Sequence, residues 1–330
     1  MTVGAGLVTG RGDDVRQMYS RFNFPRRNAE GVRAVHADLT RILASLGIPL
    51  SDLKGKRLLD AGCGTGEVAC FLASQGADVT AIDFVESSLG YAREQAARLG
   101  LQNIRFLRGS LLDYPFEPNA YDYVLSHMVL HHTEDPAGGF ANIARAAKPG
   151  GSVIFRVFCF WGTMSPFQKS PLWKRWVVRL VAGKDPDRRV RVGERLFYRA
   201  GHAEQHGLTK ETFLYDLWGV PIVYHHTWGE LMGWVRRNGL DFHSSNPSMV
   251  FSELMRPFLD PSRRSITRRG RILARAARLV LTVVPLHRLP ACRRPSRLSR
   301  FLGQATVFVS AGANMITIRA IKPSSRSALD

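Results

Sequence analysis

The feature that most constrains the fold is a glycine-rich turn directly after a short apolar strand. The segment from Leu58 to Gly66 reads LLDAGCGTG, with glycine at every second position from Gly62. Glycine allows backbone angles that other residues avoid, and it lets a ligand approach the main chain closely. The helix predicted over 67–75 presents unpaired N–H groups and the positive end of its dipole. The turn therefore predicts a strand–loop–helix unit that binds a ligand.

Short apolar runs alternate with segments of helical spacing through the first half of the chain. The predicted strands are 57–61, 78–82, 104–108, 121–125 and 152–158, and the predicted helices are 15–46 with a break at Pro25, 67–75, 85–99 and 136–147. Alternation at this spacing is typical of a parallel, doubly wound α/β sheet with helices on both faces.

The alternation stops after residue 158. Residues 159–226 are rich in Trp, Arg and Pro, which predicts a helical insertion. The sheet pattern returns at 227–246, stops again for an arginine-rich helical insertion at 247–303, and closes with strands and a tail in 304–330, including short strands expected at 307–309 and 314–321. We expect the N-terminal segment 1–50 and the insertions to form a cap over the core at 51–158.

Two acidic residues indicate which ligand the turn binds. Asp83 closes the second strand, 21 residues after Gly62, where a carboxylate meets ribose hydroxyls in nucleoside-binding folds. The dinucleotide-binding fingerprint G-x-G-x-x-G is not matched, because its last glycine position, counted from Gly62, is occupied by Glu67. Asp60, just before the turn, disfavours a pyrophosphate and favours a cationic group such as an amine.

Four segments in order resemble the class I S-adenosylmethionine-dependent methyltransferases. They are Leu58–Gly66, Gly109–Phe116 (GSLLDYPF), Tyr121–His127 followed by Val129–His132, and Lys148–Gly151 (KPGG). The resemblance covers about residues 55–158 and returns loosely at 227–246 and 314–322. It implies a Rossmann-like sheet of seven strands and S-adenosylmethionine as methyl donor, with S-adenosylhomocysteine as the product.

The resemblance also implies cofactor contacts, residue by residue. The implied contacts are Asp60 with the amino group, Gly62 and Gly64 with the methionine and ribose, Asp83 with the ribose hydroxyls, Phe84, Ser110 and Leu111 with the adenine, and the Ser126 carbonyl with the amino group. The position of Ser110 is usually Asp in this family, so we expect a changed contact there. Tyr19 is expected either to close over the cofactor or to pack within its helix.

Histidines are the candidates for a general base, which is needed only when the acceptor atom is protonated at neutral pH. His127 directly follows Ser126, and His131 and His132 are predicted to begin the helix after the fourth strand. The pair His225 and His226 stands where the first insertion rejoins the sheet. We predict catalytic roles for His127, His131 and His226; the alternatives are structural or capping roles, with Thr227 as a helix cap.

The charge is confined to two segments. The chain has 46 Lys and Arg against 27 Asp and Glu, a net charge of +19. Residues 156–199 contain 11 basic and 3 acidic side chains, and residues 256–300 contain 13 arginines and one acid, Asp260. Arginines spaced by three and four in the second segment predict an amphipathic basic helix. Three interpretations stay open: a solvated face, contact with an anionic membrane surface, or contact with nucleic acid or an anionic substrate.

Composition excludes several other classes. No apolar run approaches the roughly 18 residues of a membrane-spanning helix, and the first twenty residues have no secretory pattern. The four cysteines (Cys63, Cys70, Cys159 and Cys292) form no CxxC pair, so we predict no metal site and a cytoplasmic protein, with peripheral membrane contact left open.

These observations predict an S-adenosylmethionine-dependent methyltransferase with a small-molecule acceptor, the methylated atom (O, N or C) being open. The alternative is an RNA or lipid-headgroup methyltransferase that uses the basic insertions. A third alternative is a cofactor-binding regulatory protein without an acceptor site, which the aromatic-rich cap disfavours.

Overall fold

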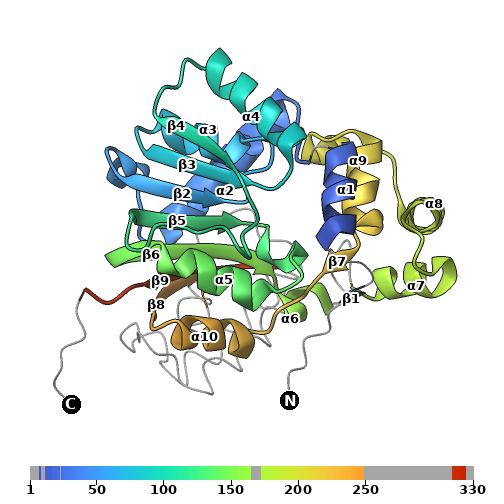
Figure 1. The fold of residues 1–330 in the computed structure, drawn as a ribbon. Coiled ribbons are helices and arrows are strands. Elements are labelled where there is room, and N and C mark those ends of the chain that lie inside the picture. Colours follow the sequence, from blue (N-terminus) through green and yellow to red (C-terminus); the bar gives the residue numbers. More distant parts are fainter. Residues whose placement is uncertain (1–6, 9–11, 23, 165–171, 249–313, 325–330) are drawn as a thin grey trace, which may run out of the picture.

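A seven-stranded sheet forms the centre of the molecule in the computed structural model, which describes residues 7–8, 12–22, 24–164, 172–248 and 314–324 (Figure 1). The strand order is β4-β3-β2-β5-β6-β9-β8. The strands are β2 (Arg57–Ala61), β3 (Asp78–Asp83), β4 (Ile104–Arg108), β5 (Tyr121–His127), β6 (Ala147–Phe158), β8 (Asp241–Asn246) and β9 (Met315–Ile321). Strand β9 runs antiparallel to both of its neighbours, β6 and β8, whereas the pairs from β4 to β6 are parallel. The predicted Rossmann-like α/β sheet of seven strands is confirmed.

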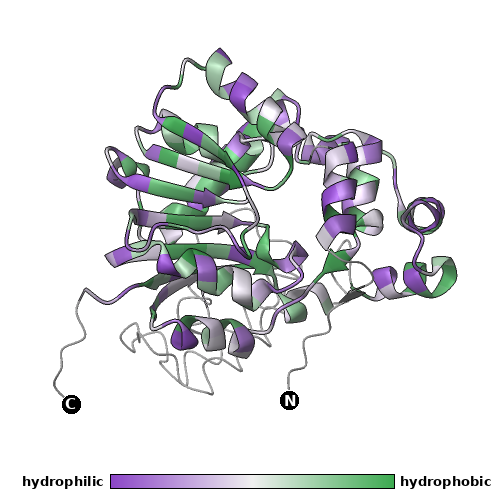
Figure 2. Cartoon of the chain, in the orientation of Figure 1, coloured by the Kyte–Doolittle hydropathy of each residue, from purple (hydrophilic) through white to green (hydrophobic). Residues whose placement is uncertain are grey.

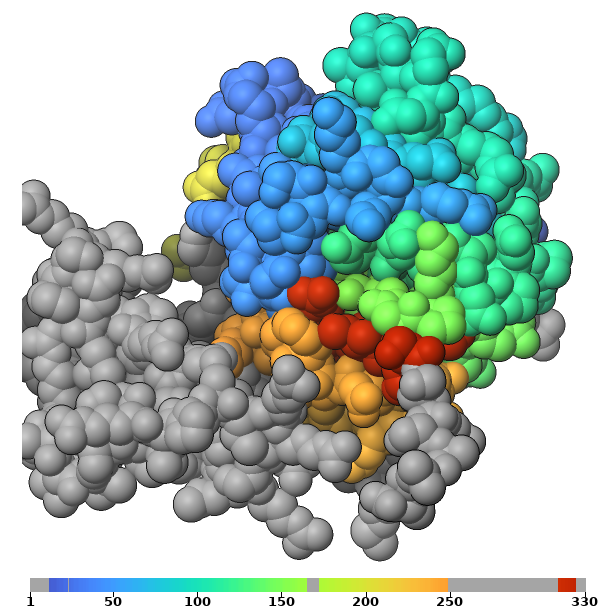
Figure 3. All heavy atoms as spheres, turned by 90° about the vertical axis from the view of Figure 1, so that its left-hand side faces the viewer, coloured from blue at the N-terminus to red at the C-terminus, as the bar shows by residue number. Residues whose placement is uncertain are grey.

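Strand β9 comes last in the chain but lies inside the sheet. It pairs with β6 on one side and with β8 on the other. In Figure 3 its red atoms lie between the green atoms of β6 and the orange ones of the segment that contains β8. The end of the described chain therefore completes the sheet.

Helices cover both faces of the sheet, as the alternating side chains of each strand require. Leu58 packs against α2 (Ala29–Ser45), α3 (Glu67–Ser74) and α4 (Glu86–Arg98) in one core cluster. Its neighbour Leu59 packs into the other cluster, with α5 (Pro136–Arg145) and α10 (Trp228–Arg237). Two adjacent residues of one strand thus face two separate cores.

A cap of short helices stands beyond the carboxyl ends of the strands. It consists of α1 (Gly12–Phe22), α6 (Phe160–Met164), α7 (Leu172–Ala182), α8 (Pro186–Phe197), α9 (Lys210–Leu214), a 3₁₀ turn (Glu204–His206) and a π-helical turn (Tyr215–Gly219). Val178, Val190 and Trp218 form a small core of its own. Strand β1 (Leu7–Val8) pairs with β7 (Ile222–Val223), and the Phe22 ring stacks on Tyr215 at 3.9 Å between centroids. These contacts bring the N-terminal segment and residues 172–223 together.

The structure corrects several predicted boundaries. His131 and His132 do not begin a helix but lie in a 3₁₀ turn (Leu130–His132). Helix α5 begins at Pro136, as predicted, where the Asp135 carboxylate caps it by accepting from the Gly138 N–H. The first helix begins at Gly12 rather than at residue 15, and the break expected at Pro25 is confirmed, with α1 ending at Phe22 and Asn28 capping α2. Strand β6 begins earlier than expected, at Ala147. The strand expected at 307–309, the arginine-rich residues 256–300 and Cys292 lie outside the described residues.

Candidate active site

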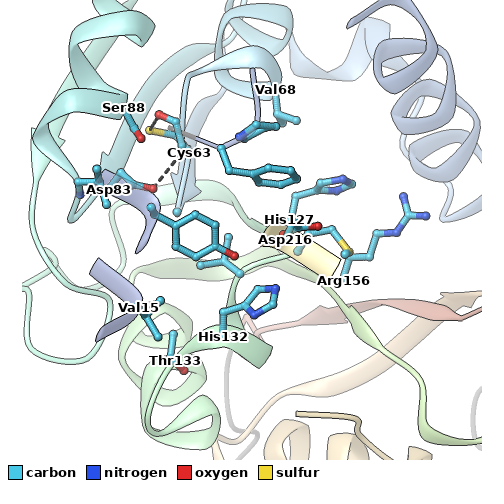
Figure 4. A pocket seen from close by; sticks show the side chains of 18 of the residues that line it. Val15, Cys63, Val68, Asp83, Ser88, His127, His132, Thr133, Arg156 and Asp216 are labelled. Atoms are coloured by element: carbon cyan, nitrogen blue, oxygen red, sulfur yellow. Dashed lines mark hydrogen bonds between the residues drawn. The ribbon is translucent and has the colours of Figure 1, made fainter. Parts of the chain in front are cut away.

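The described residues enclose a cavity of about 810 Å³ between the carboxyl ends of the central strands and the cap. Its floor comes from β2, β3, β5 and the loops that follow them, and its walls come from α1, α7 and the π-helical turn. Ligands of open α/β sheets bind at this edge. Figure 4 shows Asp83 and Cys63 on one side of the cavity and His127, His132 and Asp216 on the other.

The glycine loop is held in shape by the carboxylate at the end of β3. Asp83 accepts from the Gly64 N–H and from the Val85 N–H, each at 2.9 Å. Gly62 has φ +91°, and a Cβ there would lie 2.5 Å from both methyl carbons of Val129. A side chain at position 62 would therefore collide with the chain after β5 and also strain the backbone.

Asp60 is a buried carboxyl with unused hydrogen-bonding capacity. It is 1% exposed, and its Oδ2 atom has no hydrogen-bond partner within the described residues. Burial, followed by the nearby charge of Asp83, raises its pKa to about 7. A buried acceptor without a partner is costly unless a ligand supplies a donor, and a cationic donor compensates it best. The residue thus fits the amino group of an amino-acid-like ligand.

The loop after β4 forms the far end of the cavity. Phe84, Ser110 and Leu111 line it, and the Ser110 Oγ atom accepts from the Leu112 N–H at 3.1 Å. The Asn142 side chain fixes this loop by donating to the carbonyl oxygens of Leu111 and Tyr114 at 3.0 and 2.9 Å. Asn142 could not be predicted as part of the site, since a single amide in a helix forms no sequence motif.

His132 presents a lone pair to the cavity. Its Nδ1 atom lies 2.8 Å from the Ile222 carbonyl oxygen, which can only accept, so Nδ1 carries the hydrogen and Nε2 is the free base. Burial lowers the pKa of His132 to about 4, and the nearby Arg175 lowers it too. The imidazole is therefore neutral at physiological pH.

The cap adds charged groups beside His132. Arg175 of α7 and Asp216 of the π-helical turn line the cavity. The ring centroid of Tyr19, in α1, lies 6.1 Å from that of His132. Burial raises the pKa of Asp216 to about 6, although Arg175 counteracts it. Burial and the Asp216 charge raise the pKa of the Tyr19 hydroxyl well above its usual value.

The N-terminal segment is tied directly to the glycine loop. Glu67, the first residue of α3, accepts from the Arg27 guanidinium at 2.6 Å and from the Arg27 N–H at 3.0 Å. Both side chains are largely buried, so the pair is well shielded from water. The cap is thereby fixed against the helix that follows the loop.

Comparison with known proteins agrees with this geometry. Residues 59–155 match the family model of a methyltransferase domain. This segment is a methyltransferase domain, in agreement with the predicted resemblance to the class I S-adenosylmethionine-dependent methyltransferases. The chain is 39% identical over 107 residues to a ubiquinone biosynthesis O-methyltransferase of Paracidovorax citrulli, covering 32% of this chain and 45% of that protein. It is 30% identical over 154 residues to a demethylmenaquinone methyltransferase of Clavibacter sepedonicus, covering 46% of this chain and 58% of that one.

The matches to the curated relatives cover only part of each protein. The chain spans about half the length of these two curated relatives. Among solved structures, the [4+2]-cyclase SpnF superposes with a TM-score of 0.52 at 15% identity, covering 97% of this chain and 100% of that one. This similarity shows a shared fold alone.

The structure brings most of the predicted cofactor residues of the methyltransferase core to one cavity. Those that line it are Tyr19, Asp60, Gly62, Gly64, Asp83, Phe84, Ser110 and Leu111. Ser126 is fully buried and is not among the lining residues; its hydroxyl instead donates to the Ala61 carbonyl at 3.1 Å and joins β5 to the end of β2.

Two of the three predicted catalytic histidines lie behind the cavity wall. His131 is fully buried, with its ring centroid 4.5 Å from that of Phe158. His226 donates from Nδ1 to the Glu230 carboxylate at 2.9 Å, and its ring centroid lies 4.8 Å from that of Trp234 in α10. Neither lines the cavity, whereas their sequence neighbours His132 and His225 do. Adjacent residues in a turn or an extended segment point in different directions, so we move the proposed role from His131 to His132.

His127 also lines the cavity. Burial lowers its pKa to about 3, with a further contribution from Arg156. Arg156 itself pairs with Asp38 at 2.7 Å. His127, like His132, is therefore neutral at physiological pH, but no hydrogen bond among the described residues fixes its tautomer as the bond to Ile222 fixes that of His132.

The described residues contain no group of three His, Cys, Asp or Glu side chains placed to hold a metal ion. Cys63, Cys70 and Cys159 are buried free thiols. A search of the same residues for a helix long and apolar enough to cross a membrane finds none.

Proposed function

We propose that the protein transfers a methyl group from S-adenosylmethionine to a hydroxyl of a small, largely apolar acceptor, with His132 as general base. The observation that carries this proposal is the Nε2 lone pair of His132, which the hydrogen bond from Nδ1 to Ile222 leaves free within the cavity. A hydroxyl, unlike a thioether or a carbanion, must lose a proton as it is methylated, and a neutral imidazole accepts one.

The lining residues fit the methyl donor. S-Adenosylmethionine supplies, when bound, a methyl group already activated on a positively charged sulfur. Asp60, with its unpartnered oxygen, would bind the amino group, and Asp83 would bind the ribose hydroxyls while holding the glycine loop. Phe84, Ser110 and Leu111 would enclose the adenine. The chain's contribution is then to orient two molecules and exclude water.

The acceptor end of the cavity is apolar with a few polar groups. Phe158, Leu172, Phe213 and Leu217 line it beside His132. Such a mixture suits a ring or chain with one reacting hydroxyl. The names of the two relatives, a ubiquinone biosynthesis O-methyltransferase and a demethylmenaquinone methyltransferase, support an aromatic acceptor of the quinol type. The arginine-rich residues 256–300, on which the RNA alternative depends, lie outside the described residues.

The experiment is a methyl-transfer assay with the full chain, S-adenosylmethionine and three acceptor classes: catechols, hydroquinones and primary amines. We expect methylated phenols by mass spectrometry. His132→Asn should lower the rate about 10²–10⁴-fold, because the amide keeps the bond to Ile222 but removes the base. The control His243→Asn alters an exposed histidine of β8 and should keep the rate.

Two results would contradict the proposal. Methylation of amines but not of phenols would show that no proton acceptor for a hydroxyl is needed. An unchanged rate in His132→Asn would remove His132 from catalysis, even if phenols are methylated.

A further inference from the structure

Helix α7 has its charged and apolar faces reversed relative to an ordinary surface helix. At 100° per residue, Trp173, Trp176, Val177, Leu180 and Val181 fall within an arc of about 140°. Arg175 and Arg179 lie on the opposite side, among buried residues of the same helix. Hydrophobic residues of a soluble helix normally face the core. Here the arginines face inward and the tryptophans face out.

The outward face is exposed to an extent that folding alone does not explain. The exposed fractions are 89% for Leu180, 50% for Val181, 45% for Trp173 and 43% for Trp176. Leu196, near the end of α8, is 51% exposed. The ring of its neighbour Phe197 packs edge-on against Trp173, with 5.6 Å between the ring centroids. The apolar face of α7 thus continues onto the end of α8. Contiguous exposed apolar surface of this kind marks an interaction site.

The two inward arginines have different surroundings, and the Nη2 atom of Arg179 is buried with no hydrogen-bond partner among the described residues. Arg175 lines the cavity and lies 5.9 Å from the Phe158 ring centroid. Burial, with the nearby charges of Arg189 and Arg175, lowers the pKa of Arg179 to about 10. The buried Leu172, Val178 and Ala182 set the orientation of the helix, since Val178 packs into the core of the cap, and the apolar face is thereby held outward.

The surroundings of this face are strongly basic. Residues 172–199 contain nine Lys and Arg and three acids. All three acids are engaged: Asp185 caps α8, Asp187 pairs with Arg21, and Glu194 pairs with Lys210. The side chains of Lys184, Arg188, Arg191, Arg195 and Arg199 are exposed. Figure 2 shows the hydrophilic α8 beside the partly hydrophobic α7, and Figure 1 places both at the edge of the molecule, away from the sheet.

We propose that the outer face of α7, with the adjoining end of α8, binds an anionic membrane surface. Tryptophans suit the boundary between water and lipid, Leu180 and Val181 suit the acyl region, and the surrounding bases match anionic headgroups. A protein partner or a second copy would need acidic groups to match the same bases. The inner side of the same helix contributes Leu172 and Arg175 to the cavity, so an apolar acceptor held in the membrane would lie next to the site.

The test is co-sedimentation of the full chain with vesicles of phosphatidylcholine, with and without about 30% phosphatidylglycerol. We expect binding to the anionic vesicles, weakened by added salt, and at least about tenfold weaker binding to neutral ones. Brominated lipids should quench the tryptophan fluorescence of the wild type. A Trp173→Phe/Trp176→Phe double variant should lose most of that quenching.

Matched variants assign the binding to this face. Leu180→Glu and Trp176→Glu should each lower vesicle partitioning about tenfold or more, because a carboxylate would enter the anionic interface. Leu99→Glu, an exposed leucine after α4 (57% exposed), should leave it unchanged. Arg195→Glu should reduce binding, whereas Arg98→Glu, at the end of α4, should not. Circular dichroism melting checks that each variant is folded.

Three outcomes would overturn the proposal. One is the absence of vesicle binding by the folded wild type. The second is undiminished binding by Leu180→Glu and Trp176→Glu, which would assign the membrane contact to another part of the chain such as 256–300. The third is a concentration-dependent dimer in sedimentation equilibrium that Leu180→Glu dissociates, which would make this face an interface between two copies. None of these outcomes depends on methyl transfer.

Discussion

The Nδ1 atom of His132 lies 2.8 Å from the carbonyl oxygen of Ile222. This hydrogen bond joins the turn after β5, in the sheet core, to β7, where the cap returns to the sheet. It fixes the tautomer of His132 and directs the Nε2 lone pair into the cavity. The same contact therefore both attaches the cap and prepares the proposed base.

The low pKa of His132 predicts an unusual pH dependence of turnover. Its value of about 4 means that the base is neutral above that pH. We expect kcat, at saturating donor and acceptor, to stay constant as the pH falls through 6.5, where an ordinary histidine would become protonated. The rate should fall only as the pH approaches 4. A decline centred near 6.5 would show that His132 is solvated or is not the base.

The raised pKa of Asp60 predicts proton release on cofactor binding. In the free protein the carboxyl is about half protonated at pH 7, because burial raises its pKa to about 7. An ammonium group beside it favours the carboxylate, so binding S-adenosylhomocysteine should release a proton. Affinity should therefore rise with pH up to about 7 and then level off.

Calorimetry in buffers of different ionisation enthalpy measures this release directly. At pH 6, close to one proton should be released per ligand bound, and Asp60→Asn should abolish the release. Binding without proton exchange between pH 6 and 7 would mean that Asp60 does not face the amino group.

A pair of glycine variants separates backbone strain from steric collision. Gly62 (φ +91°) and Gly100 (φ +66°) both have left-handed backbone angles, but only at Gly62 would a Cβ meet another atom within 4 Å, the methyl carbons of Val129. Gly100→Ala should lower the free energy of unfolding by about 1 kcal/mol. Gly62→Ala should lower the free energy of unfolding by about 1–3 kcal/mol more than Gly100→Ala does, and it should also weaken S-adenosylhomocysteine binding. If urea unfolding shows that the two variants lose the same free energy of unfolding, Val129 must move aside without an energetic cost.

The parts of the structure that could be predicted are those determined by residues close together in the sequence. The strand–glycine–helix unit at Leu58–Gly66 and the acid at Asp83 are set by residues close together in the chain, and the predicted seven-stranded sheet is confirmed. Even the antiparallel β9 was expected as a closing strand, although its place between β6 and β8 depends on pairing across the whole chain.

The acceptor side could not be predicted in the same way. His131 and His132 are neighbours in sequence, as are His225 and His226, and only the tertiary structure decides which of each pair faces the cavity. Arg175 and Asp216 belong to no sequence motif, because they come from different parts of the cap. A helical projection of 172–182 does place Arg175 opposite Trp173 and Leu180, but the sequence does not say which face is buried.

The central claim, that this cavity binds the methyl donor through the glycine loop and Asp83, is tested most directly by titrating S-adenosylhomocysteine into the wild type and Asp83→Ala in a calorimeter. Asp83 orders the loop through Gly64 and would bind the ribose, so its loss removes charge-assisted hydrogen bonds. We predict one site per chain in the wild type and an affinity at least about tenfold lower in the folded variant. No binding by the wild type, or equal affinity in both proteins, would contradict the account.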